Sequence, residues 1–108
     1  MSRDLIAKSI NLNDLSNYQK DSIVSQAILN KKAGTITFFA FDKGRSLSEH
    51  TAPFDALAYL IDGEAQITIA GKQNKVKKGE IIIMPANKPH SLKAIKRFKM
   101  LLVMIKSN

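Results

Sequence analysis

Residues 79–94 read GEIIIMPANKPHSLKA, and this stretch decides the fold. Its run of isoleucines predicts an apolar strand between Gly79 and Pro85, because β-branched residues pack well on a pleated surface. Pro85 and Pro89 enclose a short loop, since proline fixes φ and biases the residue before it toward extended geometry. We therefore expect His90 at the start of a new extended segment.

Short β segments continue on both sides of that stretch. Each is rich in β-branched or aromatic residues and is bounded by turn residues. The expected strands span residues 23–29, 35–41, 57–61, 65–70, 75–78, 81–84, 90–94 and 97–105. No helical pattern of roughly 10–15 residues separates them, which argues against a βαβ architecture and indicates a sandwich, jelly roll or barrel. We expect residues 21–108 to form this barrel and residues 1–20 to form an irregular segment, with a helical turn capped by Asn13 or Asp14.

The strongest turn signal is Asp62-Gly63, because an Asp-Gly pair suits a two-residue type I′ turn. We expect a hairpin there, and residues directly opposite each other in a hairpin share a face. The inward set is then Ala56, Ala58, Leu60, Ala65, Ile67 and Ile69. Tyr59 and Ile61 point outward.

Two strands, residues 81–84 and 100–105, are apolar on both faces. A sheet that faces water on one side alternates between apolar and polar residues instead. Either another part of the chain or a second subunit covers the outer face. Because the chain has only 108 residues, we expect a homodimer.

A second stretch, residues 44–63, reads GRSLSEHTAPFDALAYLIDG. Together the two stretches resemble the paired motifs of the cupin family. The spacing matches those motifs at Gly44, His50, Gly63, Gly79, Pro85 and His90. The resemblance implies a single all-β domain with the double-stranded β-helix, or jelly-roll barrel, of cupins.

The same resemblance shows alanine where metal-dependent cupins carry ligands. The family's second histidine falls on Ala52 and its glutamate on Ala56. Only His50 and His90 remain of a set that holds Fe, Ni, Mn, Zn or a similar ion. The resemblance therefore implies either a weak site for a divalent transition metal at these two histidines or no metal, because two imidazoles need a further ligand to complete the shell.

We expect His50 and His90 to lie close together in a pocket inside the barrel. The expected lining residues are Ala52, Ala56, Ala58, Leu60, Ile67 and Met84. Glu49 and Asp55 are each one residue from a ligand position, which places them on the opposite face of an extended strand. Asn87 falls on a glycine position of the family motif, and asparagine tolerates unusual backbone geometry.

A mostly apolar pocket with two convergent polar groups is typical of a ligand site, so we favour a stand-alone barrel that binds a small molecule. The alternative is a metal-dependent cupin enzyme, an isomerase, lyase or dioxygenase, that acts on a small polar substrate. The missing ligands weaken the dioxygenase most, because redox iron normally needs three protein ligands. A third hypothesis is a sensor module that acts through a separate partner. The sequence leaves open whether the protein is an enzyme.

The composition limits partners and location. A net charge of +8 invites a nucleic-acid partner, but the basic residues are scattered over turns and strand ends without interleaved aromatics, so we do not expect one. The sequence has no cysteine, which excludes disulfides, thiolate catalysis and cysteine-bound zinc. The apolar runs are too short for a signal peptide or a membrane span, so we expect a cytoplasmic protein without a membrane partner.

Overall fold

The computed structural model describes residues 5–106. Residues 1–4 of the predicted N-terminal segment and residues 107–108 of the predicted barrel lie outside the described residues. The elements are the 3-10 turn η1 (Leu12–Asp14) and the strands β1 (Ile23–Lys31), β2 (Gly34–Phe41), β3 (Ser46–His50), β4 (Asp55–Ile69), β5 (Lys72–Lys77), β6 (Ile81–Met84), β7 (His90–Lys93) and β8 (Phe98–Ile105). The all-β fold is confirmed. Within the described residues, no helix has the length and apolar character that crossing a membrane requires.

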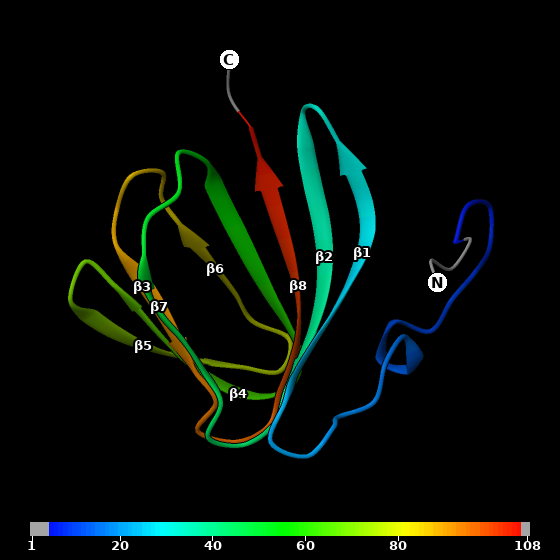
Figure 1. Cartoon of the computed structure of the whole chain (residues 1–108), viewed down its shortest axis with the longest axis horizontal. Coiled ribbons are helices and arrows are strands. Elements are labelled where there is room, and N and C mark those ends of the chain that lie inside the picture. Colours follow the sequence, from blue (N-terminus) through cyan, green and yellow to red (C-terminus); the bar gives the residue numbers. More distant parts are fainter. Residues whose placement is uncertain (1–4, 107–108) are drawn as a thin grey trace.

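Strand β4 belongs to two sheets. Its first half pairs with β6 and β8, and its second half pairs with β5 and β7. The first sheet therefore has the order β1-β2-β8-β4-β6, and the second sheet has the order β5-β4-β7-β3. Figure 1 shows the strands of both sheets diverging upward from a common closed end, so that the two sheets face each other as the sides of a curled barrel.

The hairpin predicted at Asp62-Gly63 is wrong. β4 continues without a turn through both residues, and the two-residue hairpin turn lies instead at Ala70 and Gly71, which have φ of 48° and 83°. Gly63 does have a positive φ of 75°. It has that conformation inside a strand, where the chain crosses from the first sheet to the second.

The predicted inward faces nevertheless agree with the structure. Ile61 is an extra residue in the pairing of β4 with β8, because Leu60 pairs with Met100 and Asp62 pairs with Lys99. Such a β-bulge reverses the alternation of faces along the strand. The buried residues of β4 are consequently Ala56, Ala58 and Leu60 before the bulge and Ala65 and Ile67 after it.

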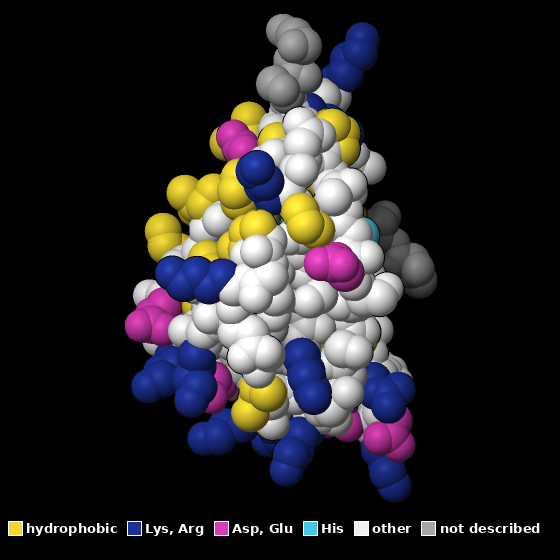
Figure 2. Space-filling model, turned by 90° about the vertical axis from the view of Figure 1, so that its left-hand side faces the viewer, with side chains coloured by type: hydrophobic (Ala, Val, Ile, Leu, Met, Phe, Trp, Pro, Cys, Tyr) yellow, Lys and Arg dark blue, Asp and Glu magenta, His cyan; other side chains and the backbone are white. Residues whose placement is uncertain are grey.

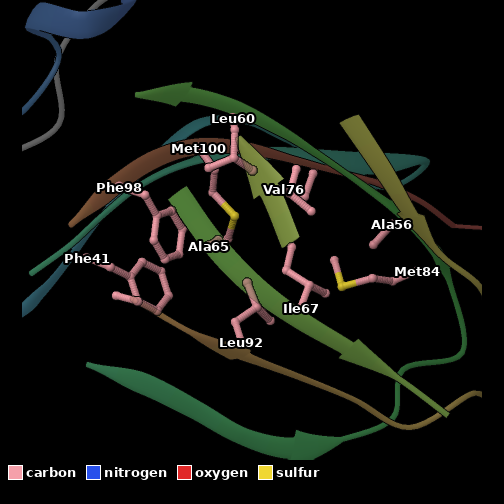
Figure 3. Close-up of a cluster of buried hydrophobic side chains, with 12 residues drawn as sticks. Phe41, Ala56, Leu60, Ala65, Ile67, Val76, Met84, Leu92, Phe98 and Met100 are labelled. Atoms are coloured by element: carbon pink, nitrogen blue, oxygen red, sulfur yellow. The ribbon is translucent and has the colours of Figure 1, made fainter. Parts of the chain in front are cut away.

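The hydrophobic core fills the closed end of the barrel. The rings of Phe41 and Phe98 stack there with centroids 4.5 Å apart. Leu60, Ile67 and Leu92 pack in the same cluster from both sheets, as Figure 3 shows. The open end is therefore the part of the interior that remains available for a ligand.

The N-terminal segment covers part of the outer face of the first sheet. Leu15 is buried against Phe38 and Ala40 of β2. The turn η1 precedes it, and its N-cap is Asn11, whose side chain accepts a hydrogen bond from the Asn13 N–H at 3.0 Å. The predicted caps Asn13 and Asp14 are wrong because both lie inside the turn.

Two polar contacts fix this segment to the barrel. The Tyr18 hydroxyl donates a hydrogen bond to Asp62 Oδ2 at 2.6 Å, and the buried Lys99 Nζ donates to the carbonyl oxygen of Asn13 at 2.7 Å. Tyr18 also lies beneath the Arg97 guanidinium, 4.6 Å from the ring centroid. The segment is thus part of the domain that it covers.

Candidate functional site

A bulge in β3 turns His50 toward His90. Leu47 pairs with Leu92 and His50 pairs with His90, so β3 has one more residue than β7 between the two pairs. The extra residue places His50 on the inner face that Leu47 already shares. The expected neighbours are indeed adjacent: their Nε2 atoms lie 3.1 Å apart and their ring centroids 4.3 Å apart.

Backbone carbonyl groups orient both imidazoles. The Nδ1 atom of His50 lies 2.8 Å from the oxygen of Ser48, and the Nδ1 atom of His90 lies 3.2 Å from the oxygen of Lys88. A carbonyl oxygen can only accept a hydrogen bond, so these two contacts are hydrogen bonds in the tautomer that carries the proton on Nδ1. In that neutral tautomer, each Nε2 presents a lone pair to the other.

The histidine pair lacks one proton for the contacts it makes. Two Nδ1 contacts and the Nε2–Nε2 contact need three protons, whereas two neutral imidazoles bring two. Burial lowers the pKa of the His90 imidazole below its ordinary value, its bond to the Lys88 carbonyl opposes this shift, and proximity to His50 adds to it. The two Nε2 atoms can thus accept from a hydrogen-bond donor, or bind a cation, that approaches both of them from the side.

Two loops brace the pair. The Asn87 N–H donates to the Ala52 carbonyl at 2.8 Å, and the Ala86 N–H donates to Asp55 Oδ1 at 2.8 Å. Asn87 has a φ of 64°, as its place in the motif predicts. These bonds connect the β3–β4 loop and the first residue of β4 to the β6–β7 loop, so the loop that follows His50 is joined to the loop that precedes His90. The Asp55 carboxylate therefore stabilises the β6–β7 loop, and Glu49 is exposed to solvent.

Both histidines line a narrow cavity of about 60 Å³. Three of the predicted lining residues, Ala52, Ala56 and Met84, do line it. The other three, Ala58, Leu60 and Ile67, are fully buried in the core and are not among its lining residues. A wider groove of about 440 Å³ beside β5 and β6 is open to solvent and contains neither histidine.

Sequence reasoning missed half of the lining. The additional residues are Leu47, Leu92, Met100, Leu102 and Met104. Leu47 lies on β3, which the sequence pattern did not predict as a strand. The residues of β8 were placed in a strand, but that strand is apolar on both faces, so only the pairing with β4 shows which face is inward.

The four-ligand metal site of metal-dependent cupins does not fit this chain. Ala52 and Ala56 offer methyl groups, and the carboxylate of Asp55 is bound to the Ala86 N–H. Among residues 5–106, no group of three histidine, aspartate or glutamate side chains comes together in a way that could hold a metal ion. At the ligand positions of the family motifs, the donors present are two imidazole nitrogens.

The fold agrees with comparisons to known proteins. A family model described as a cupin domain matches residues 37–106, and the chain belongs to the cupin family. No curated protein matches the chain.

Three solved structures illustrate the similarity. A conserved protein of unknown function from Streptococcus pyogenes has 35% identity and a TM-score of 0.90, over 94% of this chain and 90% of that one. A cupin 2 conserved barrel domain protein from Leptotrichia buccalis has 43% identity and a TM-score of 0.88, over 90% of this chain but 47% of that one, so this chain spans about half of its length. A cupin superfamily protein from Desulfitobacterium hafniense has 27% identity and a TM-score of 0.88, over 94% of this chain and 93% of that one.

Proposed function

We propose that this cupin is a binding protein that holds a small molecule at the His50–His90 pair. The observation that carries the proposal is the 3.1 Å approach of two Nε2 atoms in rings whose Nδ1 atoms lie 2.8 Å and 3.2 Å from backbone carbonyl oxygens. Such a pair accepts a hydrogen bond. The ligand class that fits is a small molecule with a hydroxyl or N–H donor.

The cavity limits the rest of the ligand. Its volume of about 60 Å³ is far below the roughly 300–1,000 Å³ of sites for drug-sized molecules. Apart from the histidines, its lining is alanine, leucine and methionine. A ligand of a few heavy atoms therefore fits, with its donor group at the histidines and its apolar part below them. Methionine side chains adapt their shape, so the cavity can widen for a slightly larger group.

A metal-dependent enzyme remains the alternative. Isomerase, lyase or dioxygenase chemistry on a polar substrate would need ligands that Ala52 and Ala56 do not supply. Binding without catalysis also suits a sensor that acts through a separate partner. Both alternatives share the histidine pair with the favoured function.

Ligand-detected and protein-detected NMR test this proposal. We expect short-chain alcohols and amines to shift resonances of the cavity residues, and short-chain carboxylates at the same concentration to shift them less. His50→Ala and His90→Ala should abolish the alcohol and amine shifts. Ser48→Ala and Lys88→Ala are matched controls, because the pair uses only the backbone carbonyls of these residues. Equal shifts from carboxylates, or unchanged binding in the alanine variants, would contradict the proposal.

We further propose that a second copy of the chain covers the outer face of the first sheet. Leu57 of β4 pairs with Ile83 of β6 on one side and with Val103 of β8 on the other. Val103 in turn pairs with Ile36 of β2. These four residues form an uncharged apolar row across four strands. The N-terminal segment leaves much of this region open: Ile81, Ile83 and Ile105 are 57%, 57% and 66% exposed.

The second sheet shows the contrast. On its outer face, Gln66 pairs with Lys75 on one side and Lys93 on the other. Figure 2 shows hydrophobic side chains in the upper part of one side of the molecule, with most Lys and Arg side chains lower down. An exposed apolar row of this kind can pack against its own copy about a two-fold axis, so a homodimer is the partner that fits.

A further inference from the structure

Two methionines flank Ala56 at the open end of the barrel. Ala56 of β4 pairs with Met84 of β6 on one side and with Met104 of β8 on the other. Residues directly opposite on neighbouring strands share a face, so the three side chains form one row inside the first sheet. Met84 is only 2% exposed, and Figure 3 shows its side chain extending from β6 into the interior.

This methionine row and the histidine pair line the same cavity. Met84, Met104, His50 and His90 all belong to its wall, and Ala56 between the methionines takes up little space. The histidines come from the second sheet and the methionines from the first. Two imidazole side chains and two thioether side chains therefore line one small cavity from opposite sheets.

The donor atoms are all uncharged, and the two thioether sulfurs among them are soft ligands. Thioether sulfur selects Cu(I), whereas carboxylate and water oxygens suit harder divalent ions. The residues that line the cavity include no carboxylate. A cation bound to both Nε2 atoms from one side would also supply the positive charge of the proton that the neutral pair lacks. The donor set thus suits a monovalent soft cation better than the divalent ions of a four-ligand site.

We propose that the cavity binds one Cu(I) ion through Nε2 of His50 and His90 and Sδ of Met84 and Met104. The inference goes beyond the proposed small-molecule binding and does not depend on it. A single ion also suits a cavity of about 60 Å³.

Anaerobic titration with Cu(I) against a chromophoric Cu(I) chelator tests the inference. We expect one Cu(I) per chain, and an affinity at least tenfold lower in the Met84→Leu/Met104→Leu variant. Leucine for methionine conserves volume, so the variant should keep its fold, which the amide NMR spectrum verifies. Zn(II) affinity should change less than twofold, because zinc prefers nitrogen, thiolate and carboxylate ligands.

Met100→Leu is the matched control. Met100 lines the same cavity but pairs with Leu60, and it lies four residues from Met104, about 13 Å along an extended strand. Its substitution should change the Cu(I) affinity less than twofold. A second readout uses Ag(I) as a redox-inert probe: the Met84 and Met104 methyl resonances should shift more than that of Met100.

Three results would overturn the inference: no uptake of Cu(I), an unchanged affinity in the double variant, or an equal loss in Met100→Leu. The outcome is separable from the proposed function. Cu(I) binding that depends on Met84 and Met104 supports the inference even if no alcohol or amine binds. Alcohol or amine binding without Cu(I) uptake supports the proposed function and refutes the inference.

Discussion

Gly63 of β4 lies opposite Phe98 of β8 at a point where the partner backbone leaves no room for a side chain. A Cβ atom on Gly63 would clash with the carbonyl oxygen of Arg97 and would lie 2.8 Å from the Phe98 Cα. The φ of 75° at Gly63 adds a backbone conformation that favours glycine. This close approach is what lets one strand cross from the first sheet to the second.

Gly63→Ala should therefore destabilise the barrel strongly. We expect a loss of about 3 kcal/mol or more in the free energy of unfolding, because backbone atoms cannot move aside cheaply. Urea denaturation followed by circular dichroism measures it. Gly71→Ala is the matched control: it also has a positive φ, of 83°, but no atom lies within 4 Å of its added Cβ, so it should cost only about 1–2 kcal/mol. Equal losses in the two variants would refute the role of the close approach.

The crossing at Gly63 also shows what the sequence could and could not predict. Asp62-Gly63 reads locally as a hairpin turn, and a positive φ is indeed present at Gly63. Whether the chain turns back or continues there depends on β8, whose backbone contacts Gly63 from residues 97–98. A contact so distant along the chain leaves no local pattern. The inward faces were still correct, because a bulge at Ile61 reverses the faces much as a two-residue loop does.

The candidate site was predictable where it depends on motif spacing. His50 and His90 were identified from their spacing, and the structure places them side by side. The bulge that turns His50 inward and the row that brings Met104 beside Ala56 depend on strand register. Register is set by pairing between distant segments, so these features required the structure.

Tyr18 should make stability depend on pH at the alkaline end. Burial raises the pKa of its hydroxyl, its hydrogen bond to the Asp62 carboxylate and the charge of that group raise it further, and Arg97 opposes the shift. Because folding raises this pKa, the contact of Tyr18 contributes fully to the free energy of unfolding below the unfolded pKa of about 10. This contribution is lost as the pH rises above that value. Wild-type protein should therefore lose more stability than Tyr18→Phe between about pH 9 and pH 11.

Below pH 9, Tyr18→Phe should be less stable than wild type by about 1 kcal/mol, since it lacks the hydrogen bond to Asp62. Urea denaturation across the pH range measures both effects. The difference between the two proteins isolates the contribution of Tyr18. Parallel pH profiles for the two proteins would show that the contact does not secure the N-terminal segment.

A third imidazole should convert the pair into a site for divalent ions. Ala52 lines the cavity beside both histidines, so Ala52→His supplies a further nitrogen donor there. We expect the affinity for Ni(II) and Zn(II) to rise at least about tenfold over wild type, measured by calorimetry. Lys77→His adds a histidine on β5, at an exposed position outside the cavity, and should leave the affinity unchanged. A similar gain in both variants would mean that the metal binds elsewhere.

The proposed homodimer predicts the mass in solution. Light scattering should give about twice the chain's 12.0 kDa at micromolar concentration. Ile83→Lys places a charge at the exposed end of the apolar row and should yield monomers, whereas Gln73→Lys on the exposed part of β5 should not. A wild-type mass near 12.0 kDa would contradict the homodimer.

The most direct test of the histidine pair is its pattern of protonation. Long-range ¹H–¹⁵N NMR of ligand-free and metal-free protein distinguishes a protonated imidazole nitrogen from a bare one. We predict a proton on Nδ1 of both His50 and His90, and chemical shifts of both Nε2 atoms that change together when a donor ligand is added. A proton on Nε2 with a bare Nδ1 in either ring would contradict the proposed binding site, because that Nε2 would then have no lone pair to offer a donor ligand.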